Sequence, residues 1–462
     1  MTAKAAMPPV QPNEVKHPIG AGKMFAWQSR AISIGANLMI FGFLSLYCTD
    51  YMGISAGLVG LLLMVSKIFD GFTDLIAGYI VDRTNTKLGR GRPYELCIIG
   101  VWLCTWLMFS CPPALSVTLK CVWIFLMYVL VTSIFTTFLN ASQTVYMVRA
   151  FKHRDQYVAI SSYGSIITML AVVAVNVTLP ILTERLATSP QGWSSMALIY
   201  AAPLAIIGIM RFIFIKETND VDAKSDEKVR IKDVILVLKT NKYIYIIALV
   251  TLVYNFVLNM GILQYYFRYI VGNIELMGAM AAIQMIAIPL VFIFPKFIKR
   301  YSVTALIASG VALVILGYIV NFIAYDNFPL LVVGQIIIGA GNVPMSMMIG
   351  LLIIDCAEYN EWKRQPRLEG TMTNINGFAQ KVGSAFGAGA MGLLLSTTGY
   401  IGAAETQIGS AMTMIRMLNS LIPAGLFVLV LIALRLYKLE TQMPVIREEN
   451  VRNRSAVITG EQ

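Results

Sequence analysis

Long apolar stretches alternate with short polar connections along nearly the whole chain. A helix needs about 20 apolar residues to cross the roughly 30 Å of hydrocarbon in a bilayer. Twelve stretches approach that length, and they lie near residues 30–53, 56–81, 94–113, 120–148, 157–183, 196–215, 243–271, 276–298, 303–325, 329–356, 371–399 and 410–437. The pattern predicts an all-α membrane protein with 12 transmembrane helices.

A charged segment divides these stretches into two groups of six. Residues 1–28 are polar and lack the compact apolar core of a secretory signal peptide. The expected organisation is a cytoplasmic tail at 1–28, a six-helix bundle at 29–215, a cytoplasmic linker at 216–242, a second six-helix bundle at 243–438 and a cytoplasmic tail at 439–462. Two bundles around a cavity at mid-membrane suit alternating access.

Lysine and arginine gather in every second connection between the apolar stretches. One such cluster is formed by Arg83, Lys87, Arg90 and Arg92. The remaining connections hold only Lys120, Arg185, Arg268 and Arg416. Because positive charge is retained on the cytoplasmic side, we expect a multi-pass plasma (cell) membrane protein with both termini in the cytoplasm.

The composition narrows the classes of function. Of the 462 residues, 57% are hydrophobic and 13% are charged, whereas globular proteins have about 45–50% and 25%. The formal charge of +11 forms no basic stripe with interleaved aromatic residues, so nucleic acid is not an expected partner. No catalytic triad, phosphate loop or metal-ligand spacing is present. The sequence therefore predicts no enzyme, no cofactor, and no metal beyond a transported ion.

Three charged residues lie inside the second apolar stretch. Lys67, Asp70 and Asp74 follow a spacing of i, i+3 and i+7, which places them on one helical face, with Thr73 beside them. Buried charges in a membrane helix indicate function, and carboxylate and hydroxyl oxygens suit a small cation. We expect a site for Na⁺ or H⁺. The alternative is that Lys67 and Asp70 form a structural ion pair and Asp74 is buried and neutral.

Polar residues in three other stretches are candidate ligands. Lys381 is the only charge in the eleventh stretch and is expected to point into the central cavity. Thr137, Asn140 and Thr144 share one face of the fourth stretch, and Asn37 lies in the first. Asn140 can complete the cation site, hydrogen-bond a substrate hydroxyl, or simply join two helices. We expect substrate near Asn37, Asn140, Thr144 and Lys381.

A third group of charges lies at the cytoplasmic ends of the helices. These residues can form ion pairs that exist only when the cytoplasmic side is closed, or can merely anchor the topology. The candidate gate residues are Asp82, Arg83, Arg149, Arg154, Asp355, Glu358, Arg364 and Arg367.

Three segments carry a resemblance to a known family. They are the loop GYIVDRTNTKLGRGRP and the blocks FDGFTDLIAGYIVDR and DCAEYNEWKR with QKVGSAFGA. Together they resemble the glycoside-pentoside-hexuronide:cation symporter family, of the major facilitator superfamily, from about Gly35 to Tyr400. The resemblance implies the superfamily's fold of two six-helix bundles.

The resemblance also implies roles for individual residues. It assigns Asp70, Asp74, Thr73 and Thr137 to the cation site, Lys67 and Lys381 to coupling, and Asp355, Glu358, Arg364 and Arg154 to the cytoplasmic gate. Ile34, Asn140 and Thr144 depart from residues that read galactosides in the family.

The resulting hypothesis is a secondary active transporter that couples a sugar or glycoside to Na⁺ or H⁺. Its partners are that small molecule, a monovalent cation and the lipid bilayer, and a monomer can suffice. One alternative is the same fold carrying a lipid or an organic anion. Another is a sensor that binds a ligand without moving it.

Overall fold

The computed structural model describes residues 19–160, 164–218, 239–284, 301–365, 369–402, 404 and 406–459. Within these ranges the chain is helical and forms no strand, only an isolated bridge between Thr86 and Gly89. The all-α prediction is confirmed for this part of the chain. We call residues 19–218 the N-terminal half and residues 239–459 the C-terminal half.

The helices of the N-terminal half are α1 (Ala21–Gly42), α2 (Leu44–Leu46), η1 (Tyr47–Tyr51), α3 (Ala56–Arg83), η2 (Arg92–Leu96), α4 (Cys97–Met108), α5 (Val117–Val129), η3 (Leu130–Thr136), α6 (Thr137–Ala150), α7 (Arg154–Ala159), α8 (Ser165–Leu186) and α9 (Pro190–Phe214). Those of the C-terminal half are α11 (Tyr243–Leu258), α12 (Leu263–Tyr266), η5 (Phe267–Val271), α13 (Glu275–Gln284), α15 (Val303–Ala324), α16 (Phe328–Trp362), α17 (Glu369–Thr397), α18 (Gly409–Leu418), α19 (Leu421–Arg435) and α20 (Leu439–Thr459). Elements η1, η3 and η5 are π-helices.

Nine helical segments in the described residues are long and apolar enough to cross a membrane. Three expected spans are not among them. The stretch near 94–113 contains α4, which is only 12 residues long, and the stretch near 276–298 lies partly outside the described residues. The third is α17, whose 29 residues include several polar side chains.

Polar caps begin many of the long helices. The side chains of five residues accept a hydrogen bond from a backbone N–H in the first turn, which satisfies a donor that has no partner within the helix. They are Ser55, Ser116, Ser189, Ser302 and Asn327. A single small polar residue therefore marks the start of these five helices.

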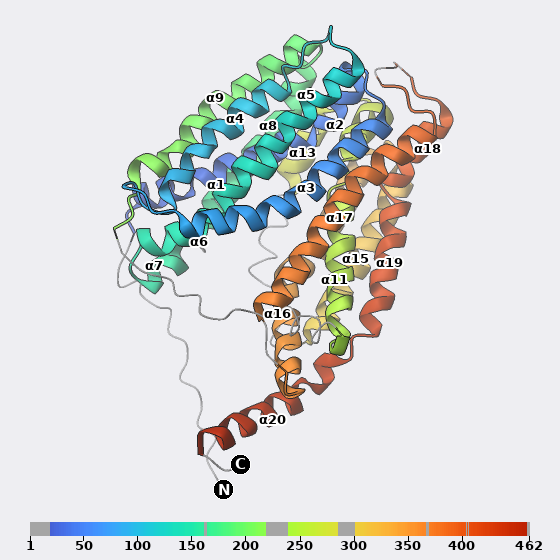
Figure 1. Ribbon diagram of the computed structural model, residues 1–462. Coiled ribbons are helices and arrows are strands. Elements are labelled where there is room, and N and C mark those ends of the chain that lie inside the picture. Colours follow the sequence, from blue (N-terminus) through green and yellow to red (C-terminus); the bar gives the residue numbers. More distant parts are fainter. Residues whose placement is uncertain are drawn as a thin grey trace.

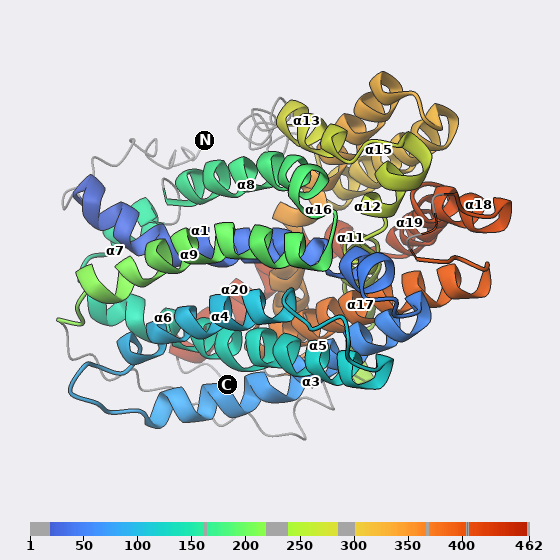
Figure 2. The same cartoon turned by 90° about the horizontal axis from the view of Figure 1, so that it is seen from above.

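The helices form two groups, which Figure 2 shows side by side, with α4, α6 and α9 in one and α15, α18 and α19 in the other. In Figure 1 the groups meet at the end that carries α2 and α18 and diverge toward α6, α7 and α20. We call these the closed end and the open end.

Packing supports this description. At the closed end, one hydrophobic core contains residues of both halves, including Tyr47, Tyr265 and Leu395. Toward the open end each half has a core of its own, around Trp27 in the N-terminal half and around Cys356 in the C-terminal half.

Small residues bring α3 and α17 together near the closed end. A Cβ atom at Gly60 would lie 2.9 Å from the carbonyl oxygen of Gly389 and 3.0 Å from Cα of Gly392. Backbones approach this closely only where side chains are absent. A Cβ atom at Gly71, farther along α3, would meet nothing within 4 Å. The seam between α3 and α17 is therefore tight at one end and loosens toward the other.

Both expected tails contain helix in the structure. Helix α1 already begins at Ala21, inside the stretch expected to be the N-terminal tail. Helix α20 occupies most of the expected C-terminal tail and buries Leu439, Met443 and Ile446 in the core of the C-terminal half. Apolar residues at i, i+4 and i+7 put these three side chains on one face of α20.

Candidate functional site

Asp70 and Asp74 of α3 face hydroxyl groups from the neighbouring helix. Oδ1 of Asp70 accepts hydrogen bonds from Thr132 at 3.1 Å and from Ser133. Oδ1 of Asp74 accepts one from Thr137 at 3.0 Å. These five side chains form what we call the carboxylate–hydroxyl cluster, and hard oxygen atoms of this kind suit a small cation.

A π-helix places the hydroxyl groups of the cluster. In η3 the backbone pattern is i to i+5, and the Thr137 hydroxyl oxygen also lies 3.1 Å from the carbonyl oxygen of Thr132. The wider turn brings Thr132, Ser133 and Thr137 to the side that faces α3. Such π-turns within α-helices recur at functional sites. The i to i+5 turn is needed to place Thr132, whereas Ser133 lies one regular helical turn before Thr137; neither residue was singled out from the sequence.

Lys381 reaches this cluster from the opposite half. Its ammonium group forms an ion pair with Oδ2 of Asp74 and lies 3.4 Å from the carbonyl oxygen of Asp70. The side chains are partly open to solvent, at 35% for Lys381 and 45% for Asp74. The ammonium group therefore lies where a cation bound to Asp74 would lie.

Lys67 makes the reverse connection, from α3 to the C-terminal half. Its Nζ donates to Oδ1 of Asn259 at 2.9 Å and to the carbonyl oxygen of Ser384 at 3.3 Å. Both hydrogen bonds go to residues of the C-terminal half. The two lysines thus join α3 with α17 in opposite directions.

The other candidate ligands are spread more widely. Thr73 donates to the carbonyl of Asp70 at 3.1 Å, so its hydroxyl is directed at its own helix. Asn37 is buried and donates to the Thr105 hydroxyl at 2.8 Å within the N-terminal half. Asn140 and Thr144 are both exposed on α6. The structure therefore brings Lys381 to the two aspartates but keeps Asn37 in a helix-to-helix contact.

The candidate gate residues that the structure describes lie toward the open end of their helices. Arg83 is stacked on the ring of Tyr79, 4.1 Å from its centroid. Arg149 is buried, and Arg364 is exposed at the end of α16. The side chains of Asp82 and Arg154, and the whole of Arg367, lie outside the described part of the chain.

The two acidic gate candidates have a partner that the sequence did not suggest. Arg447 of α20 bonds to Oδ1 of Asp355 at 2.8 Å and to Oε2 of Glu358 at 2.7 Å. The signal available in the sequence was the amphipathic spacing of α20, which brings this arginine against α16.

The closed end carries a second charged cluster that the sequence did not single out. Asp50 of η1 has a fully buried side chain and pairs with Nε of Arg268 of η5 at 3.0 Å. The same carboxylate accepts hydrogen bonds from Tyr269 at 2.7 Å and Tyr400 at 2.5 Å. The Thr49 hydroxyl adds a bond at 2.8 Å. Apart from Thr49, every one of these partners belongs to the C-terminal half.

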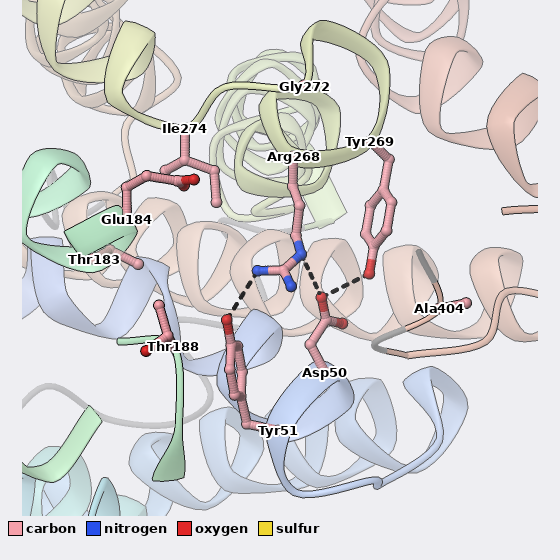
Figure 3. Close-up of a pocket in the computed structure, with 10 residues that line it drawn as sticks. All are labelled: Asp50, Tyr51, Thr183, Glu184, Thr188, Arg268, Tyr269, Gly272, Ile274 and Ala404. Carbon is pink, nitrogen blue, oxygen red and sulfur yellow. Dashed lines mark hydrogen bonds and ion pairs between the residues drawn. The ribbon is translucent and has the colours of Figure 1, made fainter. Parts of the chain in front are cut away.

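Figure 3 shows this cluster at the edge of a cavity of about 630 Å³. Arg268 points between Asp50 and Tyr51, and donates to the Tyr51 hydroxyl at 3.1 Å. Glu184 and Thr188 line the opposite wall. The cavity borders the cluster on the side of Arg268, while the Asp50 side chain stays fully buried.

Comparisons with known proteins agree with this architecture. The family model described as MFS/sugar transport protein matches residues 31–441. The isoprimeverose transporter of Lactiplantibacillus pentosus is 28% identical over 95% of this chain and 93% of its own length. The uncharacterized symporter YnaJ of Bacillus subtilis (strain 168) is 27% identical over 86% of this chain and 87% of its own.

A solved structure has the same fold. The nucleoside transporter NupG superposes with a TM-score of 0.66, at 13% identity, over 90% of this chain and 98% of that chain. At this level of identity the likeness concerns the fold alone.

Proposed function

The chain belongs to the MFS/sugar transport protein family, and from that premise we propose that it carries a sugar or glycoside together with Na⁺ or H⁺ by alternating access. The membership confirms the resemblance carried by FDGFTDLIAGYIVDR and its companion segments, and it makes the protein a membrane transporter and no enzyme. The names of the relatives support a sugar as substrate and symport as the mode. No observation favours a lipid or an organic anion.

The pairing of Asp74 with Lys381 is the observation that carries the coupling proposal. Asp70 and Asp74 bring two negative charges, and the Lys381 ammonium balances one of them. Lys67, on the same face of α3, brings a second positive charge, so a cation that binds at Asp74 must take the place of the Lys381 ammonium group there. Because the ammonium group and a cation are both attracted to the same carboxylate of Asp74, cation binding and the position of Lys381 are linked.

We infer that the ammonium group and the transported cation compete for Asp74. With the site empty, Lys381 holds α17 against α3 by this ion pair. A cation bound among the oxygens of Asp70, Asp74, Thr132 and Thr137 releases Lys381 toward the space between the halves. There it can meet a substrate hydroxyl, with Asn140 and Thr144 across from it on α6. Each ligand then raises the affinity of the other, as reciprocity requires.

The side of the membrane to which this conformation opens follows from the proposed orientation. We propose two bundles at 29–215 and 243–438, a linker at 216–242, and cytoplasmic termini, since the basic connections lie at the open end. The conformation described here is then open to the cytoplasm. Opening of the closed end would expose the carboxylate–hydroxyl cluster to the outside.

Uptake into proteoliposomes tests the function. Labelled glycosides, pentosides and hexuronates are offered with and without an inward Na⁺ gradient, at two pH values. We expect one class to accumulate, and Asp74→Asn to abolish accumulation because the neutral amide no longer binds the cation. The control is Asp326→Asn, which removes an exposed carboxylate outside the site.

Two outcomes would contradict different parts of the proposal, namely the substrate class and the coupling site. If no sugar moves in the wild type, the substrate class is wrong. If sugar accumulates equally without either gradient, or equally in Asp74→Asn, the coupling site is wrong. Dependence on Na⁺ at constant pH, or on pH without Na⁺, identifies the cation.

A further inference from the structure

Helix α20 is docked firmly across the open end of the C-terminal half. Leu439, Met443 and Ile446 are 0%, 3% and 1% exposed. The carboxylate of Glu440 accepts from the backbone N–H groups of Val303 at 2.5 Å and Thr304 at 2.8 Å, at the start of α15. A negative charge at a helix N-terminus is favourable. The position of α20 is therefore set by both apolar and polar contacts.

This docking presents Arg447 to two acids of α16. Asp355 and Glu358 lie one turn apart, so a single guanidinium group reaches both, through Nη2 at 2.8 Å and Nε at 2.7 Å. The hydrogen bond to Glu358 raises the pKa of Arg447, which keeps the group charged. Asn450 adds a bond to the carbonyl of Glu358 at 3.0 Å. The two acids thus share one positive charge from within their own half.

The exposure of Asp355, Glu358 and Arg447 indicates which member of this group can be replaced by another residue. The side chains of Asp355 and Glu358 are 9% and 18% exposed, whereas that of Arg447 is 56% exposed. The acids therefore need a cationic partner in every conformation, and the arginine can leave at little cost. A cavity of about 580 Å³ borders Leu351, Ile354, Pro444 and Arg447, so the arginine side chain has open space beside it.

We propose that Arg447 is an exchange partner for Asp355 and Glu358, and that α20 thereby acts as a brake on closure of the open end. While Arg447 holds both acids, they exert little pull on the basic side chains at the open end of the N-terminal half. When the halves approach there, those basic side chains replace Arg447. The proposal rests on the alternating access proposed above and adds a control element in the C-terminal segment.

Distance measurements on the full chain test this proposal without any transport assay. Spin labels at Lys152→Cys and Lys239→Cys, both exposed near the open end, report the separation of the two halves by double electron–electron resonance. We expect Arg447→Gln to raise the ratio of the short-distance to the long-distance population about fivefold, as the acids turn to the other half. Arg452→Gln, an exposed charge on the same helix, is the matched control and should leave the distances unchanged.

Two further variants keep the test decisive. Adding Asp355→Asn and Glu358→Gln to Arg447→Gln should restore the wild-type distances, because the acids that drive closure are gone. Arg447→Lys retains the charge but cannot bridge both acids, so an intermediate shift is expected. The proposal is overturned if Arg447→Gln matches the wild type, if Arg452→Gln shifts the distances equally, or if the triple variant stays shifted. A sugar symport assay that failed would leave these outcomes unaffected.

Discussion

The two ends of the molecule satisfy buried carboxylates in opposite ways. At the closed end, the charged partner of Asp50 comes from the opposite half, as Arg268. At the open end, Asp355 receives its charge from its own half, through Arg447. The chemistry is the same, but only the first arrangement joins the halves. From this comparison we expect that the conformation depends on which half supplies the charged partner of each acid.

The ion pairs at the two ends also differ in burial, and burial determines how much the loss of one partner costs. The Asp50 side chain is fully buried and that of Arg268 is 29% exposed, whereas Arg447 is 56% exposed. Loss of one partner of a buried ion pair costs about 3–5 kcal/mol, while exposed pairs contribute about 0–1 kcal/mol. The closed end is therefore expected to respond more strongly to a single substitution.

The largest effect is expected for Asp50→Asn, which leaves Arg268 without its counter-charge. The closed-end contact should weaken by about 3 kcal/mol, or roughly a hundredfold in the ratio of closed to open. Spin labels at Thr188→Cys and Thr406→Cys, on the two halves at this end, would report the separation. Asp326→Asn, an exposed acid at the same end, is the control. Unchanged distances would show that the cluster does not hold the end shut.

Two glycines of α3 allow the close packing between α3 and α17 to be tested independently of the ion pairs. Gly60→Ala places a Cβ 2.9 Å from the Gly389 carbonyl, whereas Gly71→Ala meets nothing within 4 Å. Overpacking typically costs about 1–3 kcal/mol, so we expect Gly60→Ala to widen the same label distance and lower the Tm. Gly71→Ala should do neither, since alanine favours helix. Equal behaviour of the two variants would refute a close seam at Gly60.

A smaller effect is expected midway between the ends, at the carboxylate–hydroxyl cluster. Thr132→Val removes one of the hydroxyl groups bonded to Asp70 without a change of shape. Loss of one such bond is worth about 1 kcal/mol, so cation affinity should fall by about fivefold. Isothermal titration with Na⁺ would measure it, with Thr178→Val, whose hydroxyl bonds to Tyr200, as the control. An unaltered affinity would remove Thr132 from the site.

The smallest effect is expected for Arg185→Gln at the closed end. Its ion pair with Glu275 joins the two halves at 3.1 Å, but the side chains are 70% and 34% exposed. We expect a shift below about 1 kcal/mol in the closed-end equilibrium, and none in high salt, where exposed charges are screened. If Arg185→Gln shifted the closed-end equilibrium as much as Asp50→Asn does, burial of an ion pair would not determine the size of its effect.

Part of the candidate site could be predicted from spacing along one helix. Lys67, Asp70 and Asp74 share a face because helical periodicity is local, and the structure places the two acids beside hydroxyl groups. Thr132 was not predicted because η3 departs from the 3.6-residue period on which that reasoning depends, whereas Ser133 lies one regular turn before Thr137 and could have been found from the spacing. The ion pairs of Arg447 and Asp50 were not predicted because their partners lie far away in the sequence.

The sequence by itself determined the class of molecule, its apolar helices, and the intramembrane acids that suit a cation. These properties follow from local composition and periodicity, because the free-energy cost of placing a charge in lipid belongs to each residue separately. Only the tertiary structure decided that Lys381 lies on Asp74, that Asp50 meets Arg268, and that Arg447 holds Asp355. These pairings depend on how two halves rest against each other, and the same chain can change that arrangement while every helix stays intact.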